Sequence, residues 1–268
     1  MILYLIYKYR MESDKICVVF TCNEKYFDKF LYTCGQLIKN GNYQGDICLM
    51  IGDDLKKKME YIEHPFIIEN HIQIKYFPDI YFTNHFLELF YKLGRDEFWI
   101  KKIFQYHKLH LFDVYFKKWD FIFYIDCGVT IYRDITPMLN SRKNLRLLAH
   151  SDSYPTYQWR LNVQFDSSSS KDIFDKLNKN YDLNIDYFQT TIMLYDTQII
   201  EENTFFNLHQ LMLEYPISKT NDQGIIALYF TNVDKKFEQI KIKDDQQYFY
   251  DYLRRDRNLP YIMLKMAS

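Results

Sequence analysis

Short apolar runs alternate with stretches of helical periodicity along most of this chain, and this alternation limits the fold more than any other feature. Ile16–Phe20, Ile47–Ile51 and Phe121–Ile125 are apolar without interruption, as strands buried on both faces of a sheet are. Between the first two, apolar side chains recur at helical spacing over Phe27–Ile38, and Gly41 follows as a stop. Strands that alternate with helices predict an α/β fold, a mostly parallel sheet with helices on both faces.

The same patterns extend the prediction along the chain. Further strands are expected at Ile72–Tyr76, Leu145–Ala149, Asn162–Phe165 and Thr190–Tyr195. Further helices are expected at His85–Leu93, Ile100–Tyr115, Lys171–Lys179, Ile199–Tyr215 and Gln223–Thr231. A length of 268 residues suits one large domain, which we expect over residues 16–268 after an N-terminal extension of residues 1–15.

Charge and cysteine content exclude several classes of protein. With 34 basic and 35 acidic residues the net charge is −1, which gives no basic field for nucleic acid. Met1–Tyr7 is apolar but too short to span a membrane. The five cysteines form no C-x-x-C pair, so we expect no disulfide framework or zinc site, and a cytoplasmic location. The many aromatic residues would be compatible with a homodimer.

Polar residues follow three of the expected strands, and ligands of α/β sheets bind beyond such strand ends. These segments are Thr21-Cys22-Asn23, Gly52-Asp53-Asp54 and Asp126-Cys127-Gly128. The carboxylate of Asp126 suits a divalent cation or a ribose, and Gly128 would let a pyrophosphate approach the backbone. The alternative is an aspartate that only makes a turn.

Several segments, in order along the chain, resemble motifs of glycosyltransferase family eight, the glycogenin and galactinol synthase type. The donor-site block of that family resembles Lys108-Leu109-His110 followed by Phe123–Ile135, which contains Asp126. Its first strand and uridine loop are similar to Phe20-Thr21-Cys22-Asn23-Glu24-Lys25-Tyr26. Its later motifs resemble Ala149–Asp152, Phe188–Tyr195 and Asn221-Asp222-Gln223-Gly224-Ile225.

The resemblance implies a GT-A fold and an enzyme that transfers a hexose or N-acetylhexosamine from a UDP-sugar to a hydroxyl of a glycan or protein. It also implies retention of anomeric configuration, usually with manganese. Carried over by residue, the uracil and ribose would be held by Thr21, Cys22, Asn23 and Tyr26. Lys108 would neutralise donor phosphate, and Asp126, with Cys127 and Gly128, would contact the ribose or a metal. The sugar and acceptor would be surrounded by Gln189, Asp222 and Gln223, with Asp152 close by.

The chain departs from the family pattern in two places. Gly128 stands where the second carboxylate of an Asp-x-Asp clamp is expected, so a manganese requirement is doubtful. The late segment that supplies a histidine and a phosphate-binding lysine has no clear counterpart, although Lys265 in the tail is a candidate. Two residues also have ordinary alternatives, since Lys108 would be a solvent-facing helix lysine and Asp222 a helix N-cap.

Two other functions compete with glycosyl transfer. The first is a nucleotide-sugar-binding or scaffold protein that has the fold but lacks catalysis, which the incomplete clamp favours. The second is a nucleotidyltransferase, which we rank last because the Thr21–Tyr26 segment has no glycine-rich phosphate loop.

Overall fold

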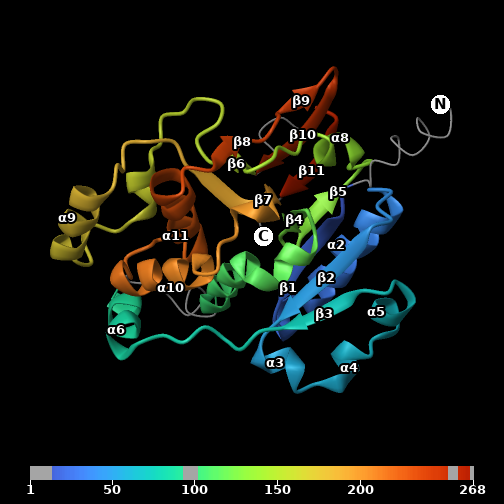
Figure 1. Cartoon of the computed structure of the whole chain (residues 1–268), viewed down its shortest axis with the longest axis horizontal. Helices are drawn as coiled ribbons and strands as arrows, with labels where there is room; N and C mark the ends of the chain where they lie inside the picture. Colours follow the sequence, from blue (N-terminus) through green and yellow to red (C-terminus); the bar gives the residue numbers. More distant parts are fainter. Residues whose placement is uncertain (1–13, 93–101, 253–258, 266–268) are drawn as a thin grey trace, which may run out of the picture.

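The computed structural model describes residues 14–92, 102–252 and 259–265, so most of the predicted N-terminal extension lies outside the described residues. A seven-stranded sheet runs through the centre of the molecule in the order β3-β2-β1-β4-β7-β6-β8 (Figure 1). Its strands are β1 (Ile16–Cys22), β2 (Asp46–Ile51), β3 (Gln73–Tyr76), β4 (Phe121–Ile125), β6 (Leu147–Ser151), β7 (Phe188–Asp196) and β8 (Phe237–Gln239).

Helices cover both faces of this sheet. The α-helices of the described residues are α2 (Phe27–Lys39), α3 (Asp53–Lys56), α4 (Met59–Ile62), α5 (Pro65–Glu69), α6 (Asn84–Lys92), α8 (Thr136–Leu139), α9 (Lys171–Asn180), α10 (Thr204–Glu214) and α11 (Asp222–Leu228). The main 3-10 segments are η1 (Glu24–Tyr26), η2 (Ile103–Phe112), η3 (Val114–Lys118), η4 (Leu161–Gln164) and η5 (Thr197–Ile199), and a π-helix, η6, spans Tyr229–Val233.

Strands β1 and β4 are apolar over most of their length because their alternate side chains enter two different cores. In β1, Val18 and Phe20 pack with α2 and α5, whereas Cys17 and Val19 pack with α6, η2, α10 and α11. A strand buried on both faces shows no polar alternation, which is why the sequence pattern located it. The expected three-layer α/β domain is therefore confirmed.

The sheet is mixed rather than parallel throughout. Four of its pairings are parallel, but β7 runs antiparallel to both of its neighbours, β4 and β6. The carboxyl ends of β1 and β4 therefore meet at one edge, next to the residues that begin β7.

A second, four-stranded sheet was not expected from the sequence. It has the order β5-β11-β10-β9, formed by β5 (Val129–Ile131), β9 (Lys243–Asp244), β10 (Gln247–Tyr252) and β11 (Tyr261–Lys265). The antiparallel pair β11·β5 sets Lys265 opposite Val129. The second sheet thereby places the end of β11 beside the turn that follows β4.

Two elements differ in type from the prediction. The expected strand Asn162–Phe165 is largely η4, with a single β-bridge from Phe165 to Ser218. Its four residues of mixed polarity are too few for the sequence pattern to distinguish a strand from a helical turn. The expected helix Ile100–Tyr115 is the pair η2 and η3, separated at Asp113, whose side chain accepts from the amide of Tyr115. Residues 100 and 101 of that prediction lie outside the described residues.

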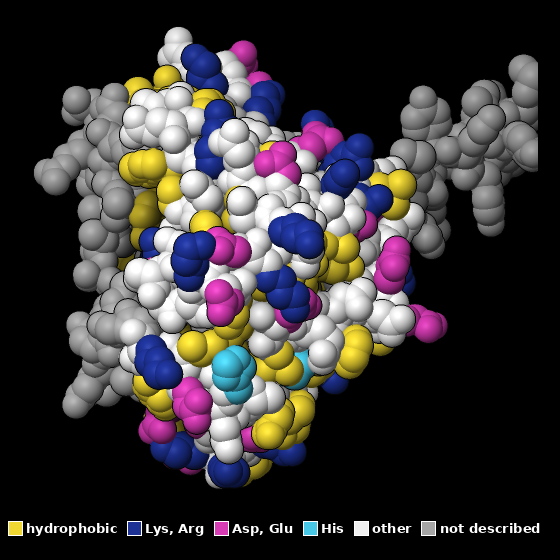
Figure 2. Space-filling model, turned by 90° about the vertical axis from the view of Figure 1, so that its left-hand side faces the viewer, with side chains coloured by type: hydrophobic (Ala, Val, Ile, Leu, Met, Phe, Trp, Pro, Cys, Tyr) yellow, Lys and Arg dark blue, Asp and Glu magenta, His cyan; other side chains and the backbone are white. Residues whose placement is uncertain are grey.

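Two further properties concern the described helices and the surface charge. Among the described helices, none has the length and apolar character needed to cross a membrane. On the face in Figure 2, basic and acidic side chains are interspersed instead of forming a field of one sign.

Candidate functional site

A pocket of about 260 Å³ opens at the carboxyl end of the central strands. The residues just beyond β1 and β4 line it, as expected where parallel strands end side by side, but the third polar strand end, Gly52-Asp53-Asp54, does not. The other walls come from η2, β7, α11 and the second sheet. The lining residues are Thr21, Cys22, Asn23, Tyr26, Lys29, Lys102, Phe104, Gln105, Lys108, Tyr124, Asp126, Cys127, Thr190, Thr191, Thr220, Asp222, Gln223, Tyr252 and Lys265.

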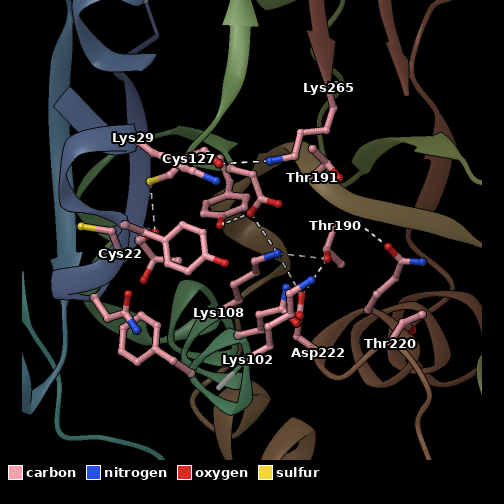
Figure 3. A pocket seen from close by; sticks show the side chains of 18 of the residues that line it. Cys22, Lys29, Lys102, Lys108, Cys127, Thr190, Thr191, Thr220, Asp222 and Lys265 are labelled. Atoms are coloured by element: carbon pink, nitrogen blue, oxygen red, sulfur yellow. Dashed lines mark hydrogen bonds and ion pairs between the residues drawn. The ribbon is translucent and has the colours of Figure 1, made fainter. Parts of the chain in front are cut away.

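The ammonium of Lys108 organises the interior of this pocket (Figure 3). Its Nζ lies 2.9 Å from Oδ1 of Asp126 and 3.2 Å from Oδ2 of Asp222. Tyr124 donates to the same Asp126 oxygen at 2.6 Å, and Thr190 donates to Asp222 at 2.6 Å. The Lys108 side chain is only 6% exposed, so the alternative of a solvent-facing lysine is wrong.

Burial and pairing together set the pKa of each group in this network. Burial alone would lower the pKa of Lys108, but Asp126 and Asp222 outweigh it and raise that pKa above its ordinary value. Burial opposes ionisation of Asp126, yet Lys108, then Lys265, hold the pKa of Asp126 below its usual range. Burial raises the pKa of Asp222, which Lys108 offsets only in part. The two carboxylates therefore depend on Lys108 for their charge balance.

Asp222 does not cap the helix that it begins. It is the first residue of α11, and the N-cap position is held by Asn221, with φ of 56°. The Asp222 carboxylate is directed to Lys108 and Thr190 instead. The N-cap alternative is thus wrong, and the neighbouring Gln223 also faces the pocket.

The end of β1 supplies the opposite wall, and Asn23 is its most informative residue. Oδ1 of Asn23 is buried and has no hydrogen-bond partner among the described residues. By contrast, the neighbouring polar groups have partners. The hydroxyl of Thr21 donates to the carbonyl of Met50 at 3.3 Å, and the thiol of Cys127 donates to the carbonyl of Thr21 at 3.3 Å. A buried carbonyl oxygen without a donor costs about 1–3 kcal/mol, so this atom suits a ligand that presents an N–H or O–H group.

Gly128 and Lys265 meet at the turn after β4. Gly128 has φ of 89°, and its amide donates to Oγ1 of Thr33 at 2.9 Å. The Lys265 ammonium donates to the carbonyl of Cys127 at 3.0 Å, as drawn in Figure 3. A Cβ on Gly128 would lie 3.4 Å from that ammonium. Gly128 itself does not line the pocket, but Lys265 does.

Gln189 and Asp152 do not line the pocket and belong to a polar cluster beside it. Gln189 donates to Oδ1 of Asp152 at 2.6 Å, and Tyr187 donates to Oδ2 at 2.6 Å. The link to the pocket is Tyr252, one of its lining residues, whose pKa is raised by burial and then by Asp152 and Asp126. Gln189 and Asp152 thus lie beside the pocket rather than in its lining.

Sequence reasoning missed several lining residues, above all Lys29 and Lys102. Lys29 is on the exposed side of α2, and Lys102 immediately precedes η2. Burial lowers the pKa of Lys102, with further lowering by Lys265, Lys25 and Lys29. A single lysine in a helix carries no motif, so no sequence signal could have selected these two.

Comparison with known proteins identifies the fold. No protein-family model matches this chain, and no curated protein matches it either. The bifunctional glycosyltransferase WbbM matches 96% of this chain with 46% of its own, at a TM-score of 0.55 and 15% identity. The galactosyltransferase LgtC, in complex with donor and acceptor sugar analogs, matches 94% of this chain with 87% of its own. Its TM-score is 0.56 and its sequence identity is 11%. The mannosyltransferase Ktr4p from S. cerevisiae, in complex with GDP, matches 85% of this chain with 69% of its own. Its TM-score is 0.51 and its sequence identity is 11%.

This chain has the GT-A fold. At identities of 11% to 15%, the matches establish the fold alone, and the predicted GT-A architecture is confirmed in a single domain. The chain spans less than half the length of WbbM. Within this GT-A domain, the pocket lies beyond the carboxyl ends of the parallel strands β1 and β4.

Proposed function

We propose that this protein is a glycosyltransferase that takes a sugar from a nucleoside diphosphate donor bound in the pocket. The observation that carries the proposal is the charge of the described lining residues, which include four lysines and two aspartates. A sugar nucleotide carries about two negative charges, which a partly closed cleft must neutralise. The positive balance among the described lining residues supports an anionic donor, and the GT-A fold supports a donor that carries a sugar.

The chemistry needs positioning and charge stabilisation more than a protein nucleophile. The bond from the anomeric carbon to the phosphate oxygen breaks, and a bond from that carbon to the acceptor oxygen forms. The hydroxyl proton of the acceptor passes to the leaving phosphate oxygen. Attack on the face that the phosphate leaves gives retention, as the resemblance to family eight implies. The pocket cations would stabilise the diphosphate as its charge increases.

Uracil is the base that we assign to the pocket. The unpaired Oδ1 of Asn23 needs a donor, and the ring N–H of uracil is one. Thr21, Cys22 and Tyr26 would complete the uridine contacts, with Asp126 near the ribose. The Asp222 and Gln223 side chains would contact the transferred sugar, and Gln189 and Asp152 the acceptor.

Thermal unfolding with UDP, GDP and ADP tests this assignment. A ligand at 100 times its Kd adds about 2.7 kcal/mol of apparent stability. We expect the largest shift in melting temperature with UDP. Asn23→Leu should weaken UDP binding at least about tenfold, whereas Asn23→Asp, which keeps an acceptor oxygen, should weaken it less. A shift with GDP or ADP but none with UDP would contradict the uracil assignment.

A second candidate function is nucleotide-sugar binding without transfer, which the glycine at position 128 favours. Release of free sugar or UDP from UDP-glucose, UDP-galactose and UDP-N-acetylglucosamine separates the two. We expect slow donor hydrolysis even without an acceptor. A protein that binds UDP but releases nothing from any of these donors would be a binding protein.

A further inference from the structure

The resemblance to family eight implies a metal ion for the diphosphate, and the residues present do not fit one. Oδ1 of Asp126 already accepts from Lys108 at 2.9 Å and from Tyr124 at 2.6 Å. Gly128 offers no second carboxylate. In the described ranges, no group of three His, Cys, Asp or Glu side chains has the arrangement to hold a metal ion. The affinity of a site for a divalent cation follows the number and charge of its ligands. A single carboxylate that is already paired with the Lys108 ammonium therefore disfavours a divalent cation.

Lys265 lies where the missing carboxylate would point. The β11·β5 ladder fixes its backbone opposite Val129, one residue past Gly128. The ammonium approaches to 3.4 Å from the position of a Cβ at Gly128. The side chain of an aspartate at position 128 would therefore occupy the same space or pair with this lysine. The glycine at position 128 therefore leaves room for the ammonium of Lys265, which takes the place of the missing carboxylate.

Lys265 is better placed than Lys108 to meet a phosphate. Lys108 is held by Asp126 and Asp222, whereas the hydrogen bond of Lys265 is to the neutral carbonyl of Cys127. An ammonium has three N–H donors, so an oxyanion can bind alongside that carbonyl. Lys102 and Lys29 line the same pocket and add to its positive potential.

We propose that the ammonium of Lys265 holds the donor diphosphate in place of a divalent cation, so that donor binding requires no metal. The inference rests on the proposed function, because it assigns the group that receives the donor's diphosphate. It also moves the phosphate-binding role from Lys108, where the sequence resemblance placed it, to the end of β11.

Calorimetric titration of UDP, once with EDTA and once with manganese, tests the inference. For the unaltered protein we expect Kd to change less than about threefold between the two conditions. Lys265→Met should weaken binding in EDTA at least about tenfold, or about 1.4 kcal/mol. Lys171→Met, which removes an exposed lysine of α9, is the matched control and should change nothing.

A second variant tests for a gained requirement for metal, which a general loss of binding could not produce. Gly128→Asp combined with Lys265→Ser restores the carboxylate and removes the cation. We expect this protein to bind UDP only with manganese, after its melting temperature has shown that aspartate is tolerated at a φ of 89°.

The outcomes separate the inference from the proposed function. Binding of UDP that EDTA abolishes and manganese restores in the unaltered protein would overturn the inference and leave the proposed function intact. Wild-type affinity of Lys265→Met in EDTA would also overturn it. If neither UDP nor GDP binds under either condition, the proposed function itself fails.

Discussion

Lys108 and Lys265 enter the same pocket from opposite sides in Figure 3, and their surroundings differ. Lys108 is surrounded by Asp126, Asp222 and Thr190, so its charge is compensated within the protein. Lys265 contacts a neutral carbonyl, and burial followed by the nearby Lys108 lowers its pKa, which Asp126 only partly offsets. Compensated charges stabilise the folded chain, whereas a partly buried cation with an incomplete set of partners is ready for an anionic ligand.

The first prediction concerns stability and has the largest expected effect. Lys108→Met leaves Asp126 and Asp222 as buried carboxylates without a cation, which should lower the free energy of unfolding by about 3–5 kcal/mol. Lys265→Met should change it by less than about 1 kcal/mol, because the Lys265 cation gains little from its partners. Urea unfolding at neutral pH measures both.

A double variant sharpens this result. Adding Asp222→Asn to Lys108→Met removes one of the two uncompensated charges and should recover part of the lost stability. If Lys108→Met unfolds at the same urea concentration as the unaltered protein, the network does not stabilise the fold, and the contrast with Lys265 is lost.

The fold was predictable wherever a segment is buried on both faces. β1 and β4 each contain five apolar or aromatic residues in a row, so their type was readable from sequence alone. The second sheet was not, because β5 has three residues, and in β10 glutamine and aspartate interrupt the aromatic residues. Three residues are too few to be recognised as a strand, and the six residues of β10 are neither continuously apolar nor strictly alternating. β5 is a strand through its pairing with β11, and β10 through its pairings with β11 and β9.

The pocket was predictable in the same uneven way. The residues after β1 and β4 were located because polar side chains at two parallel strand ends must converge. Lys265 was suggested only by its position in the tail, and Lys29 and Lys102 not at all. These lysines reach the pocket from α2, the start of η2 and β11, elements whose arrangement depends on long-range packing.

The second prediction uses pH to separate the two lysines. Burial lowers the pKa of Lys265 below the ordinary 10.5, so its charge is lost as pH rises through that lowered value. The pKa of Lys108 is raised, so its charge remains over the same range. UDP affinity should therefore fall several-fold in alkaline solution while the protein stays folded.

Lys265→Arg is the matched comparison for this effect, because arginine keeps its charge at high pH. Uracil also loses its ring proton in alkaline solution, so the informative quantity is the difference between the two proteins at each pH. An equal fall of affinity in both would mean that Lys265 does not carry the alkaline dependence.

The third and smallest effect is expected at Lys29, the most exposed of the four lysines that line the pocket. Its side chain is on the exposed face of α2, with its Nζ 5.2 Å from the ring centre of Tyr26. Exposed charges interact through water and contribute about 0–1 kcal/mol. Lys29→Met should therefore weaken UDP binding by no more than about fivefold in low salt. Lys39, which is also exposed on α2 but lies in its last turn and does not line the pocket, provides the control Lys39→Met, which should have no effect.

Salt distinguishes this outer contribution from that of Lys265. Screening acts over about 10 Å at 0.1 M ionic strength and reduces exposed interactions more than buried ones. The difference between Lys29→Met and the unaltered protein should therefore disappear as salt is raised from 0.05 to about 0.5 M, whereas the loss caused by Lys265→Met should persist. If both differences vanish together, Lys265 acts only through the general positive potential of the pocket. If neither does, Lys29 contacts the diphosphate directly, and the outer wall closes on the donor more tightly than its exposure indicates.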